Sequence, residues 1–322
     1  MQVLDQTASG QDFSGSPDRP QDGAQGIDRV ARLDRKTFAA RYFRARKPVI
    51  ITDMATHWPA VQKWSFDFFA GLDPDRQVTL ETGNVLQDET NFETAGIADY
   101  LSKLEQEGGA APKGDKKRYL SMFRIFEQFP HLKADVDFSL IEALTMRQIY
   151  FGWLGPAGTL TGYHIDWIDN IFSQIRGRKR FTLVSPEQSR GMYTSRKYDY
   201  RSSLSEVEPN TWDRARHPLY AEVRPVQFVL EPGQILFLPA GWWHRVEGLA
   251  PSISVNAFAQ DWRGMIGRQA RADLLHGLHR LGLYGRADCT CHSRTNSKTS
   301  LYRGMDMCRV PMMRRWTSCS ST

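Results

Sequence analysis

The sequence predicts a mainly β protein with flanking helices, whose core is a jelly roll or a barrel. Two observations carry this prediction. A series of short strand-like runs fills residues 148–258, and Gly and Pro residues punctuate them. Helical patterns occur on both sides of this section. Many short strands joined by tight turns are typical of closed antiparallel architectures.

Helical and extended patterns alternate before the strand-rich section. Phe38, Tyr42 and Phe43 recur at helical spacing, which predicts a helix over Asp34–Phe43. Ser65 is a suitable N-cap for the helix that we expect after it. The other expected elements are strands over Pro48–Ile51, Val78–Glu81 and Tyr119–Phe123, helices over Phe66–Leu72 and Ile97–Gln106, and a turn at Trp58–Ala60.

Eight strand-like runs form the predicted core, and a helical pattern follows them after Asp261. The expected strands are Gln148–Trp153, Gly162–Asp166, Asn170–Ile175, Arg180–Val184, Val226–Leu230, Ile235–Leu238, Arg245–Leu249 and Ser252–Phe258.

Composition divides the chain into four parts. Residues 1–26 are rich in Gly, Ser, Asp, Gln and Pro and are expected to be disordered. Residues 27–262 form the folded domain, with its β core at about 148–258, and residues 263–284 form a helical segment. Residues 285–322 are a basic tail rich in Ser, Cys and Met, which we expect to be poorly ordered. All four cysteines lie at or after Cys289, so the predicted core needs no disulfide.

Composition also excludes some classes of protein. No run of 18 apolar residues occurs, which predicts no membrane helix, and the first residues do not resemble a secretory signal. We therefore expect a cytoplasmic protein. The net charge is +6, with much of the excess near the C-terminus. This charge alone is weak support for a nucleic-acid partner, and we do not expect one.

Two histidines and one aspartate stand out as metal ligands. His164 and Asp166 are two apart on an expected strand, so their side chains point to the same face. His244 lies 78 residues beyond Asp166, at the end of another expected strand. Two imidazoles and one carboxylate form the facial triad that binds Fe(II) and leaves further coordination positions open. An isolated His-x-Asp is weak, however, and buried core histidines are the alternative interpretation.

The surrounding residues strengthen the metal interpretation. The spacing of Gly233, Pro239, Gly241 and His244 resembles the second cupin motif. Several other segments resemble the JmjC and cupin-like 8 family of oxygenases, and together they cover about residues 30–262. The matching segments are Pro48–Ile51, Trp58–Ala60, Lys63–Ser65, Gly155–Thr159, His164-x-Asp166, Gln174–Arg180, Leu236–His244 and Ser254–Phe258.

This resemblance implies a double-stranded β-helix of the cupin and JmjC type, with Fe(II), 2-oxoglutarate and O₂ as cofactor and co-substrates. It implies that His164, Asp166 and His244 are the catalytic metal ligands. Lys179 would pair with the distal carboxylate of 2-oxoglutarate, and Thr161 would bind the same group. Asn170, Asn256 and Tyr119 would line the co-substrate pocket.

The resemblance implies hydroxylation of a peptide or protein side chain, with release of succinate and CO₂. Hydroxylation of a small molecule, N-demethylation and a non-catalytic cupin-fold binding module remain alternatives. The segment Arg190–Arg224 carries aromatic and basic residues and is either a substrate-recognition loop or a surface insertion. Helices after the barrel pair two copies in relatives, which predicts a homodimer through Trp262–Leu283.

Overall fold

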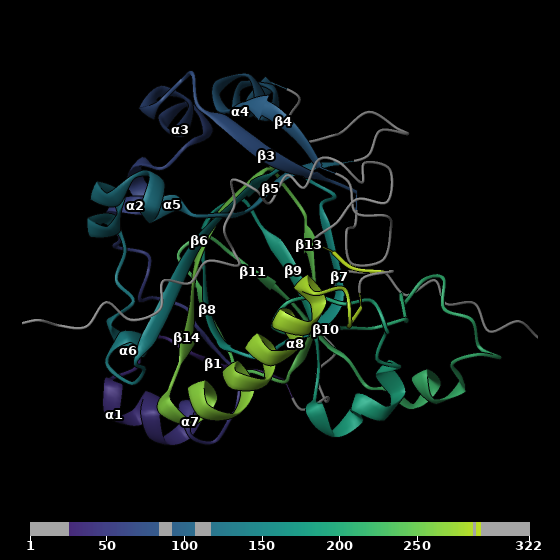
Figure 1. Cartoon of the computed structure of the whole chain (residues 1–322). Helices are drawn as coiled ribbons and strands as arrows, with labels where there is room; N and C mark the ends of the chain where they lie inside the picture. Colours follow the sequence, from purple (N-terminus) through teal and green to yellow (C-terminus); the bar gives the residue numbers. More distant parts are fainter. Residues whose placement is uncertain (1–25, 84–91, 107–116, 286–287, 291–322) are drawn as a thin grey trace, which may run out of the picture.

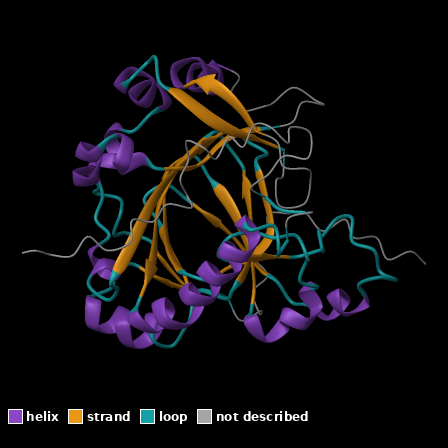
Figure 2. Cartoon of the chain, in the orientation of Figure 1, coloured by secondary structure: helices purple, strands orange, loops and turns teal. Residues whose placement is uncertain are grey.

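The computed structural model describes residues 26–83, 92–106, 117–285 and 288–290. Two β-sheets face each other in the centre of the molecule, and most helices lie on the outer side of the longer sheet (Figures 1 and 2). The expected mainly β fold with flanking helices is therefore confirmed. The segments predicted to be disordered or poorly ordered, 1–26 and 285–322, lie outside the described residues except for residues 26, 285 and 288–290.

The N-terminal part alternates helices and strands. Asp34 caps the first helix by accepting a hydrogen bond from the Thr37 amide, and Ser65 caps α3 by accepting one from the Phe68 amide. The elements are β1 (Asp28–Val30), α1 (Arg35–Phe38), the π-helix η1 (Ala39–Phe43), β2 (Val49–Ile51), α2 (Pro59–Lys63), α3 (Phe66–Leu72), β3 (Gln77–Thr82), β4 (Phe92–Gly96), α4 (Ile97–Gln106), β5 (Arg118–Phe123), α5 (Ile125–Gln128), the 3₁₀ helix η2 (Pro130–Asp135) and α6 (Ser139–Glu142).

All eight expected core strands are present, with ends that differ from the prediction by a few residues at most. The core elements are β6 (Arg147–Gly155), β7 (Leu160–Asp166), β8 (Asp169–Arg176), β9 (Lys179–Val184), the 3₁₀ helix η3 (Pro186–Met192), β10 (Ser202–Leu204), the 3₁₀ helix η4 (Pro218–Glu222), β11 (Val226–Leu230), β12 (Ile235–Leu238), β13 (Trp243–Gly248) and β14 (Ser252–Gln260). The C-terminal elements are α7 (Trp262–Gly264), the π-helix η5 (Met265–Gln269) and α8 (Ala270–Arg280).

The core strands alternate between the two sheets along the chain, as in a jelly roll, except that β9, β10 and β11 all lie in the short sheet. The long sheet has nine strands in the order β1-β2-β12-β8-β14-β6-β5-β3-β4, and the short sheet has five in the order β10-β7-β13-β9-β11. The pairs among β6 to β14 are antiparallel. The N-terminal strands extend the long sheet on both sides of its four core strands.

Each face of the long sheet has a different role. On β14, Ile253, Val255 and Ala257 point outward into the largest apolar cluster, which also contains aromatic residues of the N-terminal helices. Ser254 and Asn256 alternate with them and point toward the short sheet. A smaller apolar cluster fills the space between the sheets; its buried members are Ile50, Phe172, Phe181, Leu183, Leu230, Leu236 and Leu238.

Some elements differ from the sequence prediction. The expected turn at Trp58–Ala60 is wrong, because Pro59 begins α2; the fixed φ of proline suits the first position of a helix. The short strands β1, β4 and β10 were not predicted. Within the segment Arg190–Arg224, the side chains of Met192, Val207 and Tyr220 cover the outer face of the short sheet.

The C-terminal helical segment is followed by a short contact with the domain. Cys289 is buried and forms an isolated parallel bridge with Tyr198. Asp288 and Thr290 add backbone hydrogen bonds to Tyr198 on either side of this bridge. Among the described residues, the structure contains no helix with the length and apolar character that a membrane span requires.

Candidate metal centre and co-substrate pocket

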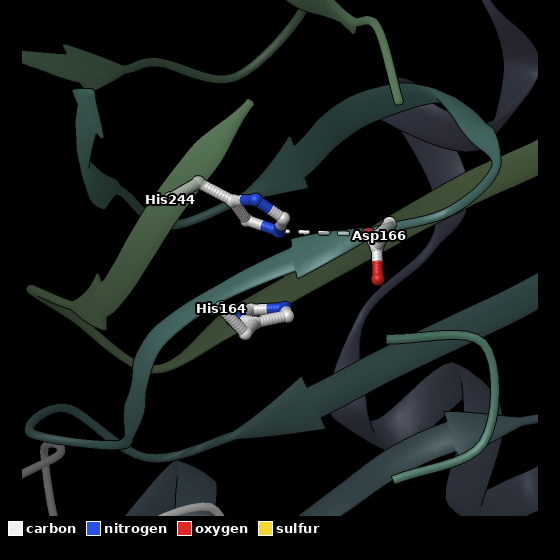
Figure 3. A group of neighbouring side chains, drawn as sticks. All are labelled: His164, Asp166 and His244. Atoms are coloured by element: carbon white, nitrogen blue, oxygen red, sulfur yellow. Dashed lines mark ion pairs between the residues drawn. The ribbon is translucent and has the colours of Figure 1, made fainter. Parts of the chain in front are cut away.

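The three predicted metal ligands meet at the short sheet. His164 and Asp166 lie on β7, and His244 lies directly opposite His164 on the neighbouring strand β13. The two imidazole rings are 4.0 Å apart between centroids, and His244 Nε2 lies 3.5 Å from Asp166 Oδ2 (Figure 3). One ligand atom from each residue lies within 4.8 Å of the others. This separation suits three donors around a single ion.

Backbone carbonyl groups orient both imidazoles. His164 Nδ1 lies 2.8 Å from the Gly162 oxygen, and His244 Nδ1 lies 3.1 Å from the Trp242 oxygen. A carbonyl oxygen can only accept a hydrogen bond, so each Nδ1 carries the proton. Each Nε2 is then left with a lone pair for a metal ion.

Burial changes the proton affinity of the ligands. Burial and the neighbouring His164 hold the pKa of His244 well below its ordinary value, so this imidazole is neutral at pH 7. Burial raises the pKa of Asp166 to about 6, and Asp199 adds to this increase while His164 opposes it. A neutral His244 imidazole beside a carboxylate whose pKa is about 6 suits a divalent cation, which binds deprotonated donors.

A β-bulge places Thr161 on the same face as His164. The register between β7 and β13 pairs His164 with His244 but Thr161 with Val246, so β7 has one extra residue between these pairs. Residues opposite each other in an antiparallel pair share a face, as do residues two apart such as His244 and Val246. Thr161 and His164 therefore both face the interior, although they are three residues apart.

Lys179 lies in the space between the sheets. Its side chain is 1% exposed, and its Nζ donates a hydrogen bond of 2.8 Å to the Tyr119 hydroxyl oxygen. Nζ also lies 5.3 Å from the centroid of the Tyr119 ring and 5.2 Å from that of Phe172. Burial alone lowers the pKa of Lys179 to about 7, and no carboxylate among the described residues pairs with it. A buried cation without a counter-charge is a binding point for an anion.

Asn170 and Asn256 lie together on the inner face of the long sheet. The Asn256 Nδ2 donates to Asn170 Oδ1 over 2.8 Å, and the Trp153 Nε1 donates to Asn256 Oδ1 over 2.7 Å. Both asparagines are buried. Trp153 was not predicted as part of the site. It lies two residues after Phe151 on β6, and this spacing places both side chains on the inner face.

Two more carboxylates near the centre were also missed. Glu81 lies opposite Tyr119 in the register of β3 and β5. Burial raises the pKa of Glu81 to about 7, and a repulsive effect of Asp199 adds to it. Asp199 precedes β10, whose Ser202 lies opposite Asp166. Nothing in the sequence marks these acids, because their proximity results from pairings between distant segments.

Comparisons with known proteins agree with this fold. The Cupin-like domain family matches residues 35–261. The chain is 32% identical over 231 residues to Jumonji C domain-containing protein 5 of Drosophila melanogaster, covering 68% of this chain and 56% of that protein. It is 30% identical over 230 residues to lysine-specific demethylase 8 of Xenopus tropicalis, covering 68% of this chain and 49% of that protein.

A third relative carries the name of a different activity. The chain is 26% identical over 251 residues to human tRNA wybutosine-synthesizing protein 5, covering 72% of this chain and 77% of that protein. This chain spans about half the length of the first two relatives. The family match covers the β core, the three predicted metal ligands and Lys179. The chain belongs to the cupin-like JmjC oxygenase family.

Proposed function

We propose that this chain is an Fe(II)- and 2-oxoglutarate-dependent dioxygenase that hydroxylates a side chain of a peptide or protein. One observation carries the proposal: the His164, Asp166 and His244 donors share the space between the sheets with the buried cation of Lys179. A metal triad alone would suit many cupins. A triad combined with a buried lysine suits a metal-bound dicarboxylate whose far end needs a positive partner.

The donors of this chain fit the proposed iron. Two imidazole nitrogens and one carboxylate oxygen are the ligand set that Fe(II) takes in oxygenases with open coordination positions. When bound, iron supplies the oxidation that places one oxygen atom of O₂ in the substrate and the other in succinate, with loss of CO₂ from 2-oxoglutarate.

The protein residues orient the reactants and exclude water. Lys179 and Tyr119 would hold the distal carboxylate of 2-oxoglutarate, and Thr161 faces the same space. The Asn170 and Asn256 pair, fixed by Trp153, would keep the pocket wall in one arrangement. The apolar cluster between the sheets removes water, which strengthens the contact of Lys179 with an anion.

Glu81 and Asp199 support a cationic side chain as the target. Together with Asp166 they make this region rich in carboxylates, each of whose pKa is raised by burial. A lysine or arginine side chain would relieve the repulsion between these acids. N-demethylation of a methylated lysine is thus a second candidate function, and two relatives carry the name lysine-specific demethylase 8.

The first experiment is an anaerobic titration of metal-free protein with Fe(II) and then 2-oxoglutarate. We expect a visible charge-transfer band in the wild type and none in His164→Ala or Asp166→Ala, with circular dichroism showing that both variants fold. A folded, iron-loaded wild type without the band would refute the oxygenase proposal.

Substrate class is tested next by succinate release on matched peptides that contain arginine, lysine, N-methyllysine or glutamine. We expect turnover only with the cationic peptides, and a Glu81→Gln variant should lose most of this preference. Product mass separates the two functions: a gain of one oxygen atom indicates hydroxylation, and loss of a methyl group indicates demethylation. Equal turnover of the glutamine peptide would rule out recognition by Glu81 and Asp199.

A further inference from the structure

A buried carboxylate joins the two segments that carry the metal ligands. Asp169, three residues after Asp166, is fully buried at the start of β8. Its Oδ1 accepts a hydrogen bond of 2.8 Å from the backbone amide of Ala240, four residues before His244. A second link joins the same segments, because the Gly241 amide donates to the Asp166 carbonyl oxygen over 2.9 Å. Asp169 thus lies outside the metal centre: it follows Asp166 in the chain and accepts a hydrogen bond from the turn before His244.

Arg46 supplies the counter-charge from a distant part of the chain. Its guanidinium nitrogen NH1 lies 2.6 Å from Asp169 Oδ1, and NH2 donates to the Ala240 carbonyl oxygen over 3.1 Å. The Arg46 carbonyl oxygen accepts a hydrogen bond of 3.0 Å from Trp242 Nε1. The backbone of Arg46 has a φ of 55°, a conformation that non-glycine residues seldom adopt. These contacts fix the turn between β12 and β13 from its outer side.

The arrangement explains why a carboxylate is buried here. Removing Arg46 would leave Asp169 as a buried charge whose Oδ2 has no hydrogen-bond partner among the described residues. The bonds of Asp169 and Arg46 converge on Ala240 and Trp242, and the Trp242 carbonyl oxygen in turn orients the imidazole of His244. Outer contacts of this kind usually set the direction of a metal ligand.

We propose that Arg46 and Asp169 are positioning residues, which hold the β12–β13 turn so that His244 meets His164 and Asp166 at one metal ion. The inference rests on the proposed metal-binding function of the three ligands. It assigns to the N-terminal segment, which holds none of the candidate ligands, a direct part in the geometry of the centre. Loss of the ion pair should therefore weaken metal binding more than it weakens the fold.

Cobalt(II) binding to the metal-free full-length chain tests this inference without turnover. We expect Arg46→Met, which keeps the length of the side chain but removes its charge, to raise the cobalt Kd by about 10- to 100-fold and to alter the visible cobalt spectrum. Arg46→Lys keeps the charge on Asp169 and should recover part of the affinity. Arg44→Ala, which removes an exposed arginine two residues away, should bind as the wild type does.

Asp169→Asn provides an independent test. The asparagine side chain can still accept a hydrogen bond from the Ala240 backbone amide, but it lacks the negative charge that pairs with Arg46. The double variant with Arg46→Met should then bind cobalt no more weakly than the weaker single variant. A folded Arg46→Met or Asp169→Asn protein with the wild-type Kd and spectrum would overturn the positioning role. Wild-type binding that survives His164→Ala would instead show that the proposed metal centre itself is wrong, which separates the two failures.

Discussion

Lys179 shows how one residue can prepare a pocket for an anion. Its ammonium group is surrounded by the Tyr119 and Phe172 rings and has only the Tyr119 hydroxyl as a hydrogen-bond partner among the described residues. Burial therefore lowers its pKa to about 7. A carboxylate bound at this point would favour the charged form and raise the pKa again. Anion binding and proton uptake are then coupled at physiological pH.

The coupling gives a pH dependence with a definite sign. Below about pH 7 the free protein already carries the Lys179 proton, so 2-oxoglutarate binds without proton uptake. Above that pH the proton must be taken up first, so we expect affinity to fall as pH rises from 7 until the higher pKa of the complex is reached. Titrations of iron-loaded protein with 2-oxoglutarate between pH 6.5 and 8.5 measure how the affinity changes with pH.

The variant Lys179→Met tests whether Lys179 causes this pH dependence. We expect it to raise the Kd for 2-oxoglutarate by 10-fold or more, since one charge-assisted bond contributes roughly 1.5–3 kcal/mol, and to abolish the pH slope. Tyr119→Phe should keep the slope, because it removes the hydroxyl but not the titrating amine. A Lys179→Met protein that retains both the affinity and the slope would show that the carboxylate binds elsewhere.

Turns between strands are the elements that place these residues. Gly177 lies between β8 and β9, two residues before Lys179, and Gly241 lies between β12 and β13, three residues before His244. Both have positive φ, 70° and 92°. The two glycines differ in the room around them. A Cβ added at Gly177 would lie 2.1 Å from the Pro251 carbonyl oxygen, whereas a Cβ added at Gly241 would have no atom within 4 Å.

This difference predicts unequal costs for two alanine substitutions. Gly241→Ala should cost only the strain of a side chain at positive φ, about 1–2 kcal/mol of unfolding free energy. Gly177→Ala adds a clash with backbone and should lose roughly 3 kcal/mol or more. Chemical denaturation of both variants, in metal-free protein, measures the difference. Equal losses would mean that the Pro251 segment moves away without cost.

The same elements show what the sequence could predict. The core strands were found because their alternating or continuous apolar patterns reflect burial on one or both faces, as on β14. The candidate metal ligands and Lys179 could be selected from the sequence because they stand in local motifs. Arg46, Asp169 and Glu81 were missed, since each acts through a contact between segments far apart in the chain. The bulge on β7 depends on its pairing with β13 and leaves no sequence pattern either.

On the scale of the whole molecule, the metal centre and the N-terminal segment belong to one packed unit. The largest apolar cluster joins the helices before residue 73 to the outer face of β8, β12 and β14. The inner face of the same strands carries Asn170 and Asn256. A ligand bound between the sheets therefore acts on strands that the N-terminal helices also hold. We expect the domain to unfold in one cooperative transition.

Metal binding should shift that whole transition. A ligand that binds only the folded state at 100 times its Kd stabilises it by about 2.7 kcal/mol. For a domain of this size that corresponds to a rise in Tm of roughly 5–10 °C. In the wild type, we expect cobalt to raise the Tm measured by far-ultraviolet circular dichroism and the Tm measured by tryptophan fluorescence by the same amount. In His164→Ala, we expect cobalt to change neither Tm. Because tryptophans lie both in the N-terminal cluster (Trp58 and Trp64) and in the core sheets (Trp153 and Trp243), a fluorescence transition that separates from the dichroism transition would show that the domain does not unfold as one unit.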